Sequence, residues 1–351
     1  MSFTSDLISW YEANKRDLPF RGIREPYLIW VSEVILQQTR MEQGLDYYNR
    51  FVERFPNIKS LASASEEEVL KTWQGMGYYS RARNLHASAR YVVNSLGGKF
   101  PETFEQIRLL KGVGDYSAAS VASQAFDEPQ AAVDGNVFRF IARHFGYRDE
   151  VNSSSGKKRV KTMAETLMDK NRPGTFNQAM IEYGALVCTP KNPSCGECVF
   201  QHSCFAFHQK LVQELPVKKR AVKARKRYLN YLVITSNSKK GTEVIVNKRE
   251  GDDIWKNLYD FPVIETAKKT SLSQLMKSAE WKDIFQGKEL SKITISEEFR
   301  HILSHQVILA TFCLIRMDVP PAKYKTRISI QQMASIPVPR LISKYWQKYF
   351  H

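Results

Sequence analysis

The sequence lacks the features that would mark a membrane or secreted protein. No segment reaches the roughly 18 consecutive apolar residues that a membrane-spanning helix needs. The first residues, MSFTSDLISWYEANKRDLP, contain no apolar run of signal-peptide length and carry both acids and bases. We therefore expect an intracellular, cytoplasmic protein with no membrane partner.

Acidic residues are in deficit. The 351 residues include 52 Lys and Arg against 36 Asp and Glu, which gives a formal net charge of +16 at pH 7. This excess favours a polyanionic partner, and nucleic acid comes before a membrane surface. The composition, 43% hydrophobic and 25% charged, is that of ordinary globular domains, and the length suits two or three of them.

Cysteines are few, and four of the five are clustered. The segment CTPKNPSCGECVFQHSC has the spacing C-x6-C-x2-C-x5-C. Disulfides are not expected in a reducing compartment, whereas four thiolates this close can enclose one metal centre. The spacing alone leaves zinc, an iron–sulfur cluster and no metal open. We expect a structural site at Cys188, Cys195, Cys198 and Cys204, and a buried strand position for Cys313.

Strand-like runs are scarce in the first part of the chain. Apolar residues recur there every three or four positions, with short turns between the segments, which predicts an all-α region over residues 1–214. A basic stretch with almost no apolar residues predicts a linker over 215–227. The linker either follows a phosphate backbone or is simply solvated.

The pattern of residue types along the sequence changes after the linker. Residues 228–351 combine β-branched runs of strand length with one segment of helical spacing, LSQLMKSAEWKDIF. We therefore predict a separate and smaller α+β domain. The expected strands are YLNYLVITS, TEVIVNKR and HQVILATFCLIRM.

Two glycines separate two helical runs in IRLLKGVGDYSAASVASQAF. Gly112 and Gly114 permit backbone conformations that are closed to other residues. The unpaired N–H groups at the start of the second helix can bind a phosphate. This pattern predicts a helix–hairpin–helix over about residues 105–126, which holds a DNA backbone without reading its sequence.

Two acids are notable for their surroundings. Glu33 shares an apolar helical stripe with Ile29 and Leu36, so it is exposed, paired, or kept protonated for chemistry. Asp134 precedes a helix in AAVDGNVFRFIAR, where it can act as an N-cap. We expect burial to raise the pKa of Glu33 and the helix N-terminus to lower that of Asp134. A proton donor beside an anion suits cleavage of a glycosidic bond.

Together these segments resemble the helix–hairpin–helix DNA glycosylases with an iron–sulfur loop, the endonuclease III superfamily, and within it the adenine-specific branch. The resemblance covers essentially the whole chain. It implies a hydrolase that removes adenine paired with 8-oxoguanine or guanine from double-stranded DNA and leaves an abasic site. It also implies one [4Fe–4S] cluster, no nucleotide cofactor and a monomer. The segments in the family's order are WVSEVILQQT, WQGMGYYSRARNLH, LKGVGDYSA, VDGNVFRF, NQAMIEYGALVC and the cysteine loop.

The resemblance assigns roles to individual residues. Glu33 looks like the general acid at adenine N7, Asp134 like the carboxylate that faces C1′, and Asn136 like the residue that orients them. Bifunctional relatives carry a lysine where Tyr116 stands, and a tyrosine has no amine to attack the sugar. The four clustered cysteines look like the cluster ligands. Candidates for the adenine pocket are Arg16, Arg21 and Gln178, and those for the duplex and the orphaned base are Gln38, Thr39 and Tyr78.

Residues 228–351 resemble the Nudix-like domain with which the family recognises 8-oxoguanine. FRHILSHQ is similar to the family's Phe-x-His-x-Phe-Ser-His loop, which makes Ser304 and His305 candidates for contacts with 8-oxoguanine. No Arg-Glu-x-x-Glu-Glu run occurs in this segment, so we do not expect pyrophosphate hydrolysis. Phe20 and Leu303 depart from the family's LPWR and from the second Phe of its loop, which concerns affinity more than reaction type.

Two other functions are compatible with the sequence. One is a bifunctional glycosylase and lyase acting on oxidised pyrimidines, which Tyr116 and the C-terminal domain disfavour. The other is a non-catalytic DNA-binding protein that uses its cluster as a redox sensor. Glu33 would then be dispensable, and no base would be released from any duplex.

Overall fold

The computed structural model describes residues 2–37, 39, 41–151, 153–217, 224–239, 241–288, 290, 292–303 and 305–350. Residues 1–63 and 84–220 form one compact unit, and residues 64–83 and 221–351 form a second. The first unit is helical, and the second contains a β-sheet. Across these described ranges, no helix is both long enough and apolar enough to span a membrane.

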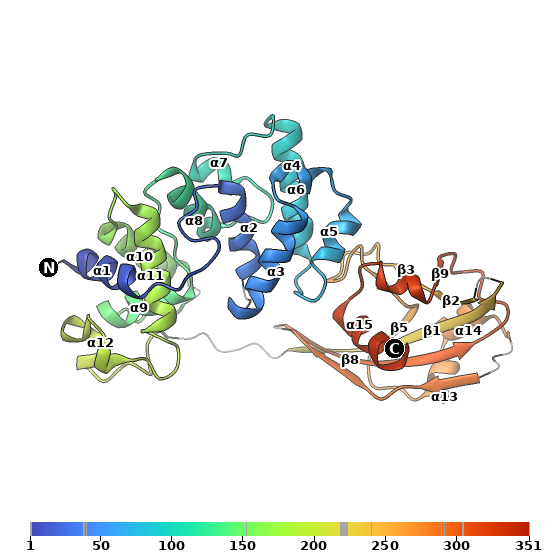
Figure 1. Ribbon diagram of the computed structural model, residues 1–351. Helices are drawn as coiled ribbons and strands as arrows, with labels where there is room; N and C mark the ends of the chain where they lie inside the picture. The colour runs from blue at the N-terminus through green and yellow to red at the C-terminus, as the bar shows by residue number, and fades with distance from the viewer. Residues whose placement is uncertain are drawn as a thin grey trace. The chain divides into compact units, whose positions relative to one another are not determined.

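Helices account for the regular structure of the first unit, as predicted (Figure 1). The first turn of α6 (Ser80–Ser95) belongs to the second unit and the rest of that helix to the first. The other helices of this unit are α1 (Phe3–Asn14), α2 (Pro26–Leu36), α3 (Met41–Arg54), α4 (Ile58–Ser63), α7 (Phe104–Arg108), α8 (Asp115–Phe126), α9 (Gly135–Phe145), α10 (Ser154–Leu167), α11 (Pro173–Leu186), η1 (Cys195–Glu197), η2 (Gln201–Ser203) and α12 (Phe205–His208).

Helix α2 is apolar around most of its circumference because it packs against both α3 and α8. Pro26 occupies its first position, where a missing N–H costs nothing, and the Glu25 side chain accepts a hydrogen bond from the Tyr27 N–H. Trp30 and Ile35 are fully buried. A helix enclosed in this way carries Glu33 into the interior of the unit.

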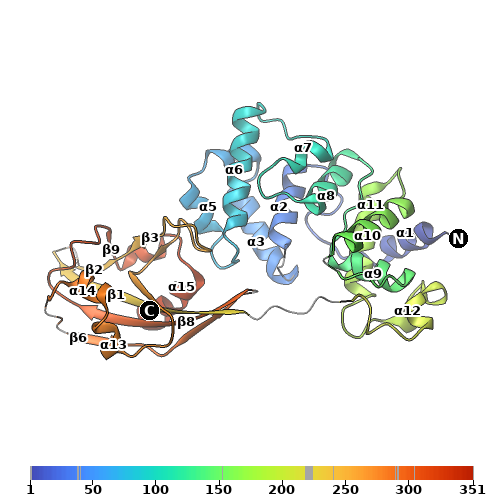
Figure 2. The ribbon, with the colours of Figure 1, turned by 180° about the vertical axis from the view of Figure 1, so that it is seen from behind.

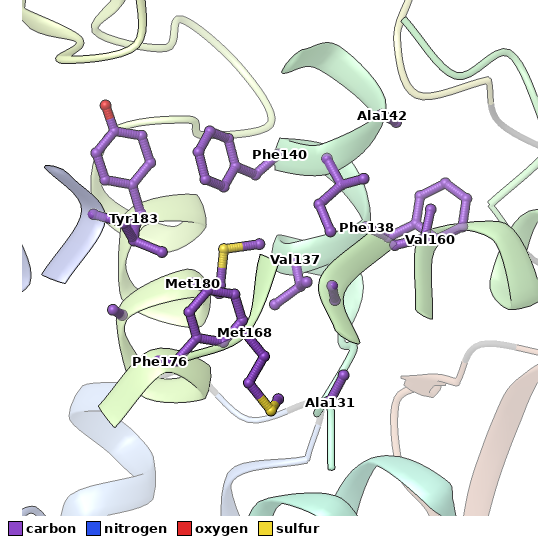
Figure 3. Packing of buried hydrophobic residues seen from close by; sticks show 14 of the residues in the cluster. Ala131, Val137, Phe138, Phe140, Ala142, Val160, Met168, Phe176, Met180 and Tyr183 are labelled. Carbon is purple, nitrogen blue, oxygen red and sulfur yellow. The ribbon is translucent and has the colours of Figure 1, made fainter. Parts of the chain in front are cut away.

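One hydrophobic core of this unit lies among α1, α9, α10 and α11, which lie side by side in both ribbon views (Figures 1 and 2). Figure 3 shows the aromatic and methionine side chains of α11 packed against α9. This packing fixes the start of α9, where Asp134 lies. The buried side chains that these two helices contribute are Val137, Phe138, Phe140, Ile141, Ala142, Phe176, Ala179, Met180 and Tyr183.

The second unit contains a seven-stranded sheet with strand order β6-β8-β1-β2-β9, in which β5 also pairs with β1 and β7 with β8. The central strands β1 and β8 run parallel, with Tyr231 opposite Phe312. The predicted strands and helical segment are confirmed. The elements are β1 (Arg225–Ser238), β2 (Gly241–Ile245), β3 (Asn247–Lys248), β4 (Tyr259–Asp260), β5 (Val263–Thr266), α13 (Leu272–Met276), α14 (Ala279–Phe285), β6 (Lys292–Ile295), β7 (Phe299–Ile302), β8 (Gln306–Arg316), β9 (Arg327–Ser329), η3 (Gln331–Ala334) and α15 (Arg340–Phe350).

Helices pack on both faces of this sheet. Successive side chains of a strand point to opposite faces, so neighbouring residues of β8 contact different helices. Phe312 of β8 stacks on Tyr345 of α15, with ring centroids 3.9 Å apart. The next residue, Cys313, lies in the core that Trp281 and Phe285 of α14 share. Cys313 is thus a buried strand residue, as predicted.

Residues 64–83, which include α5 (Glu66–Thr72), group with the C-terminal part of the chain. Within this second unit Lys71 donates a hydrogen bond to the Ile336 carbonyl at 3.1 Å, and Arg83 donates one to the Lys256 carbonyl at 2.9 Å. The compact units therefore differ from the predicted boundaries, because these contacts join segments that are far apart in the sequence.

Both ends of the predicted linker over 215–227 belong to the folded units. The Leu215 carbonyl accepts a hydrogen bond from Arg143 Nε at 2.9 Å, and Val217 forms a β-bridge with Glu150. Strand β1 begins at Arg225. Residues 218–223 lie outside the described residues.

Candidate active site

Glu33 projects from α2 toward α8, where a buried serine binds it. The Ser120 hydroxyl donates a hydrogen bond to Glu33 Oε1 at 2.6 Å. The pKa of Glu33 is raised to about 6, chiefly by burial and with a contribution from the negative charge of Asp134. Hydrogen bonds from Ser120, Tyr116 and Gln124 act in the opposite direction. The raised pKa predicted for this acid is confirmed.

Asp134 is the N-cap of α9, as predicted. Its Oδ1 accepts hydrogen bonds from the backbone N–H groups of Asn136 and Val137, both at 2.8 Å, and its Oδ2 accepts one from Asn136 Nδ2 at 2.7 Å. Burial nevertheless raises the pKa of Asp134 above its usual value. The expectation of a lowered pKa was therefore wrong, because the loss of solvent outweighs the donors at the helix N-terminus.

Asn136 is itself held in place by a buried arginine. Arg139 donates a hydrogen bond to Asn136 Oδ1 at 2.8 Å and others to the carbonyls of Gly184 and Cys188, at 2.6 and 2.7 Å. The same guanidinium thus links the cap of α9 to the end of α11 and to the first cysteine of the clustered loop. An arginine fork suits this task because its donors lie in one plane.

A cavity of about 580 Å³ brings the two acids together. Its lining includes Glu33, Tyr116, Asp134 and the hairpin glycines Gly112 and Gly114. Burial raises the pKa of Tyr116 well above its usual value, and the two nearby carboxylates add to the shift, so the phenol stays neutral. Three of the four catalytic candidates, Glu33, Tyr116 and Asp134, therefore share one cavity within the helical unit. Asn136 does not line this cavity but is hydrogen-bonded to Asp134.

The helix–hairpin–helix consists of α7, the glycine turn and α8. Gly112 has φ +80°, and a Cβ there would lie 2.7 Å from Asn84 Nδ2, so the position requires glycine. Gly114 instead has an extended backbone and precedes α8 without a side-chain cap. The first N–H groups of α8 thus have no side-chain partner from the residue that precedes the helix, which is the arrangement expected at a phosphate site.

A second and larger cavity, about 740 Å³, is lined by Arg16, Arg21 and Gln178, the three candidates for the adenine pocket. None of the residues that line the first cavity also lines this one, within the part of the chain that the structure describes. Gln124, one turn beyond Ser120 on α8, also lines the second cavity. The structure therefore places the two groups of predicted residues around separate cavities.

Glu182, which the sequence reading missed, organises the second cavity. Arg16 donates hydrogen bonds to its two carboxylate oxygens at 2.8 and 2.6 Å, and Arg21 at 3.0 and 2.7 Å. Burial favours the protonated acid, but the two guanidinium groups prevail and lower the pKa of Glu182 to about 2. The available signal was an acid inside the apolar segment AMIEYGALV, the same pattern that drew attention to Glu33.

The four clustered cysteines line one small cavity together with Phe140, Phe200 and other residues of α9 and the loop. The Tyr183 hydroxyl lies 3.0 Å from Cys198 Sγ, and Arg143 Nη1 lies 3.5 Å from Cys188 Sγ. Four soft ligands that line one cavity, with hydrogen-bond donors beside two of the sulfurs, fit a cluster of iron and sulfide.

The candidates for the duplex and for 8-oxoguanine lie in both units. Tyr78, in the second unit, has φ 47° and a ring that is 40% exposed. Thr39, in the first unit, donates a hydrogen bond to the Gln37 carbonyl at 3.3 Å. His305 is exposed in the loop before β8. Gln38 and Ser304 lie outside the described residues.

The two departures from the family pattern have ordinary surroundings. Phe20 is buried and meets Tyr48 edge to face, with ring centroids 5.3 Å apart. The Leu303 N–H donates a hydrogen bond to the carbonyl of Gln306, the first residue of β8, at 2.8 Å.

Family models match most of the chain. The model for the "HhH-GPD superfamily base excision DNA repair protein" matches residues 31–170, and that for the "NUDIX domain" matches residues 230–348. The "Iron-sulfur binding domain of endonuclease III" matches residues 188–204. The chain therefore carries one [4Fe–4S] cluster, and the iron–sulfur reading of the cysteine spacing is confirmed.

Curated relatives span most of this chain. An adenine DNA glycosylase of Buchnera aphidicola subsp. Baizongia pistaciae is 30% identical over 86% of this chain and 83% of its own length. One of Buchnera aphidicola subsp. Schizaphis graminum is 32% identical over 76% of each chain. The adenine DNA glycosylase of Mus musculus is 45% identical over 59% of this chain. The chain spans only about two fifths of the length of the mammalian relatives that it matches.

Solved structures resemble the helical part. A thermostable thymine-DNA glycosylase is 30% identical, with a TM-score of 0.55, and the match covers 59% of this chain and 95% of that one. A non-covalent complex of endonuclease III with DNA, 21% identical with a TM-score of 0.51, shares the fold. The match covers 60% of this chain and 99% of that one.

Proposed function

This chain belongs to the adenine DNA glycosylase family, and on that basis we propose that it hydrolyses the N-glycosidic bond of adenine mispaired with 8-oxoguanine or guanine in double-stranded DNA. The observation that carries the proposal is the cavity shared by Glu33 and Asp134, two carboxyls in different hydrogen-bonded settings. Glycoside cleavage uses such a pair, one as proton donor and one as anion.

In the proposed reaction protonated Glu33 donates its proton to N7 of an adenine that has been flipped out of the duplex. The bond between N9 and C1′ breaks with its electron pair going to the base, which leaves neutral. Ionised Asp134 stabilises the positive charge that develops on the sugar, either across space or by a transient bond to C1′. Water then adds to C1′ and loses a proton, which leaves an abasic site.

Asn136 and Tyr116 complete this site. Asn136 orients the Asp134 carboxylate through two donors, and Arg139 fixes Asn136 in turn. Tyr116 offers a neutral phenol to Glu33 and has no amine to form a Schiff base with the sugar. The enzyme therefore removes the base without cleaving the strand.

The other assignments follow from the same membership. Arg16, Arg21 and Gln178 contact the extruded adenine from the larger cavity. Thr39, Gln38 and Tyr78 contact the duplex, and the hairpin at Gly112 and Gly114 binds a phosphate of its backbone. Ser304 and His305 contact the orphaned 8-oxoguanine from the Nudix-like domain. The residues that hold the [4Fe–4S] cluster are Cys188, Cys195, Cys198 and Cys204.

A single-turnover assay tests this function. The duplex carries one adenine opposite 8-oxoguanine, and the proteins are the native chain, Glu33→Gln and Glu102→Gln, which removes an exposed acid. We expect release by the native chain and by Glu102→Gln, loss of release by Glu33→Gln, and strand breaks only after alkali. Borohydride should trap no covalent complex, because Tyr116 cannot form an imine.

The opposite results separate the rival functions. A native chain that holds its cluster and binds the duplex but releases no base would be a DNA-binding sensor. Strand breaks without alkali, with a complex trapped by borohydride, would show a bifunctional lyase. Because the enzyme acts on DNA, we place it in the cytoplasm at the nucleoid. We also propose that it is a monomer.

A further inference from the structure

Helix α8 carries two polar residues, one turn apart, that form a hydrogen-bonded chain ending on Glu33. Ser120 is fully buried, and its Oγ lies 2.6 Å from Glu33 Oε1. Gln124 Nε2 lies 2.7 Å from the same Oγ. Buried polar side chains in a helix are costly unless their hydrogen bonds are satisfied, so this pair has a specific task in the site.

The direction of the chain follows from one further contact. Gln124 Nε2 also lies 3.2 Å from the Ser120 carbonyl oxygen, which can only accept a hydrogen bond. The amide nitrogen must therefore face Ser120, and it donates to the serine hydroxyl as well. The hydroxyl thus accepts from Gln124 and donates its single proton to Glu33 Oε1.

We propose that Ser120 and Gln124 are positioning residues for the general acid: they hold Glu33 Oε1 as an acceptor, so that the acid carries its reactive proton on Oε2. This inference rests on the proposed function of Glu33. It also explains how one carboxyl can be both protonated and oriented, because a neutral carboxyl that could place its proton on either oxygen would face the base correctly only part of the time.

The chain also connects the two cavities of the site. Glu33 lines the smaller cavity, and Gln124 lines the larger one beside Arg21 and Gln178. The serine between them is closed to solvent. Gln124, which lines the larger cavity, is thus one hydrogen bond removed from the serine that orients the acid in the smaller one.

Ser120 should also set how readily Glu33 ionises. Its hydroxyl stabilises the carboxylate that remains after proton transfer, and so opposes the effect of burial on the pKa. The other titratable groups that act on Glu33 are the Tyr116 phenol, on α8, and the Asp134 carboxyl, at the start of α9. Removal of the serine hydroxyl leaves burial and the Asp134 charge with less opposition.

The test compares the native chain with Ser120→Ala, Gln124→Met and Ser32→Ala. Ser32 is the matched control, since its buried hydroxyl is adjacent to Glu33 on α2 but donates to the Ile29 carbonyl of its own helix. The first readout is the pKa of Glu33, measured by NMR with isotope label in the glutamate carboxyl groups and assigned by the signal lost in Glu33→Gln. The second is the pH profile of single-turnover adenine release.

We expect Ser120→Ala to raise the pKa of Glu33 and to move the alkaline limb of the rate profile to higher pH. The maximal rate should fall about tenfold or more, because a hydrogen bond to a developing charge is lost. Gln124→Met should produce a smaller shift in the same direction, since the serine hydroxyl becomes free to turn and the weaker hydrogen bond from Gln124 to Glu33 is lost. Ser32→Ala should leave the pKa and the limb unchanged.

An unchanged pKa of Glu33 in both Ser120→Ala and Gln124→Met would overturn the inference, as would an equal shift in Ser32→Ala. If Ser120→Ala does not fold, Gln124→Met alone decides the matter. Absence of adenine release by the native chain would refute the proposed function instead. The NMR titration would still report whether Ser120 holds the Glu33 carboxyl.

Discussion

The Tyr183 hydroxyl lies 3.0 Å from the sulfur of Cys198. Tyr183 is fully buried between Trp10 and Phe140. Burial and the neighbouring sulfur both raise the pKa of Tyr183, so its phenol remains a donor. Cys198 is one of the proposed cluster ligands, and hydrogen bonds to ligand sulfurs are among the factors that set the reduction potential of an iron–sulfur cluster.

We therefore predict that Tyr183→Phe lowers the reduction potential of the cluster. The ring and its packing remain, and only the donor that stabilises negative charge on the sulfur is lost. Voltammetry of the protein, with iron content and visible absorbance as checks of loading, measures this shift. An unchanged potential at full cluster content would show that the hydroxyl does not interact with the cluster.

Glu33 should control the pH dependence of base release. The general acid must be protonated, and its pKa is about 6, so the rate should level off only well below that pH and fall as the pH rises through it. At high pH the fall should approach about tenfold per unit. Single-turnover rates between pH 5 and 9 test this, and a rate that increases across this range would assign Glu33 the role of a base.

Glu33 should lower the free energy of unfolding at neutral and alkaline pH. A carboxyl whose pKa is raised by folding binds more protons in the folded state, so stability falls as the pH rises from about 4.5 through 6. Glu33→Gln removes this effect and should be more stable than the native chain at pH 8, by up to about 2 kcal/mol. Thermal or denaturant unfolding at pH 4 and pH 8 measures the difference, which should be nearly absent at the lower pH, below both pKa values.

Glu182, unlike Glu33, should stabilise the folded state when its carboxyl is ionised. Its folded pKa of about 2 lies below its unfolded value, so the contribution is complete above about pH 4.5 and is lost as the pH falls toward 2. Glu182→Gln leaves Arg16 and Arg21 without their shared charge and should cost about 3 kcal/mol at pH 7. Glu102→Gln breaks an exposed ion pair with Lys99 and should cost less than about 1 kcal/mol. Equal losses would contradict the packing described for Glu182.

Gly184 should tolerate no side chain. A Cβ there would lie 2.7 Å from the Asn136 carbonyl oxygen and 2.8 Å from the Asn136 Cβ. Gly184→Ala therefore has to separate α11 from the start of α9, at a cost of about 1–3 kcal/mol. Base release should fall as well, because Asn136 orients Asp134. Gly251→Ala, where the added Cβ has open space, is the control for both measurements.

Much of the fold follows from local patterns in the sequence. The helical and strand periodicities predicted the two kinds of structure, and the spacing of four cysteines predicted a metal loop. Glu33 and Asp134 were singled out from the same patterns, although each also has an ordinary structural explanation, and the family resemblance then assigned their roles. Their surroundings were harder to foresee. Whether burial or hydrogen bonding prevails at Asp134 depends on how many atoms exclude water from it.

The sequence by itself determined the element types, the cysteine cluster and the identity of the two acids, because periodicity, spacing and composition act over short distances along the chain. Tertiary structure alone decided that Glu182 binds two arginines more than 160 residues away, that residues 64–83 group with the C-terminal part, and that Ser120 and Gln124 reach Glu33. These contacts join distant segments, and only the packing of helices sets which side chains meet.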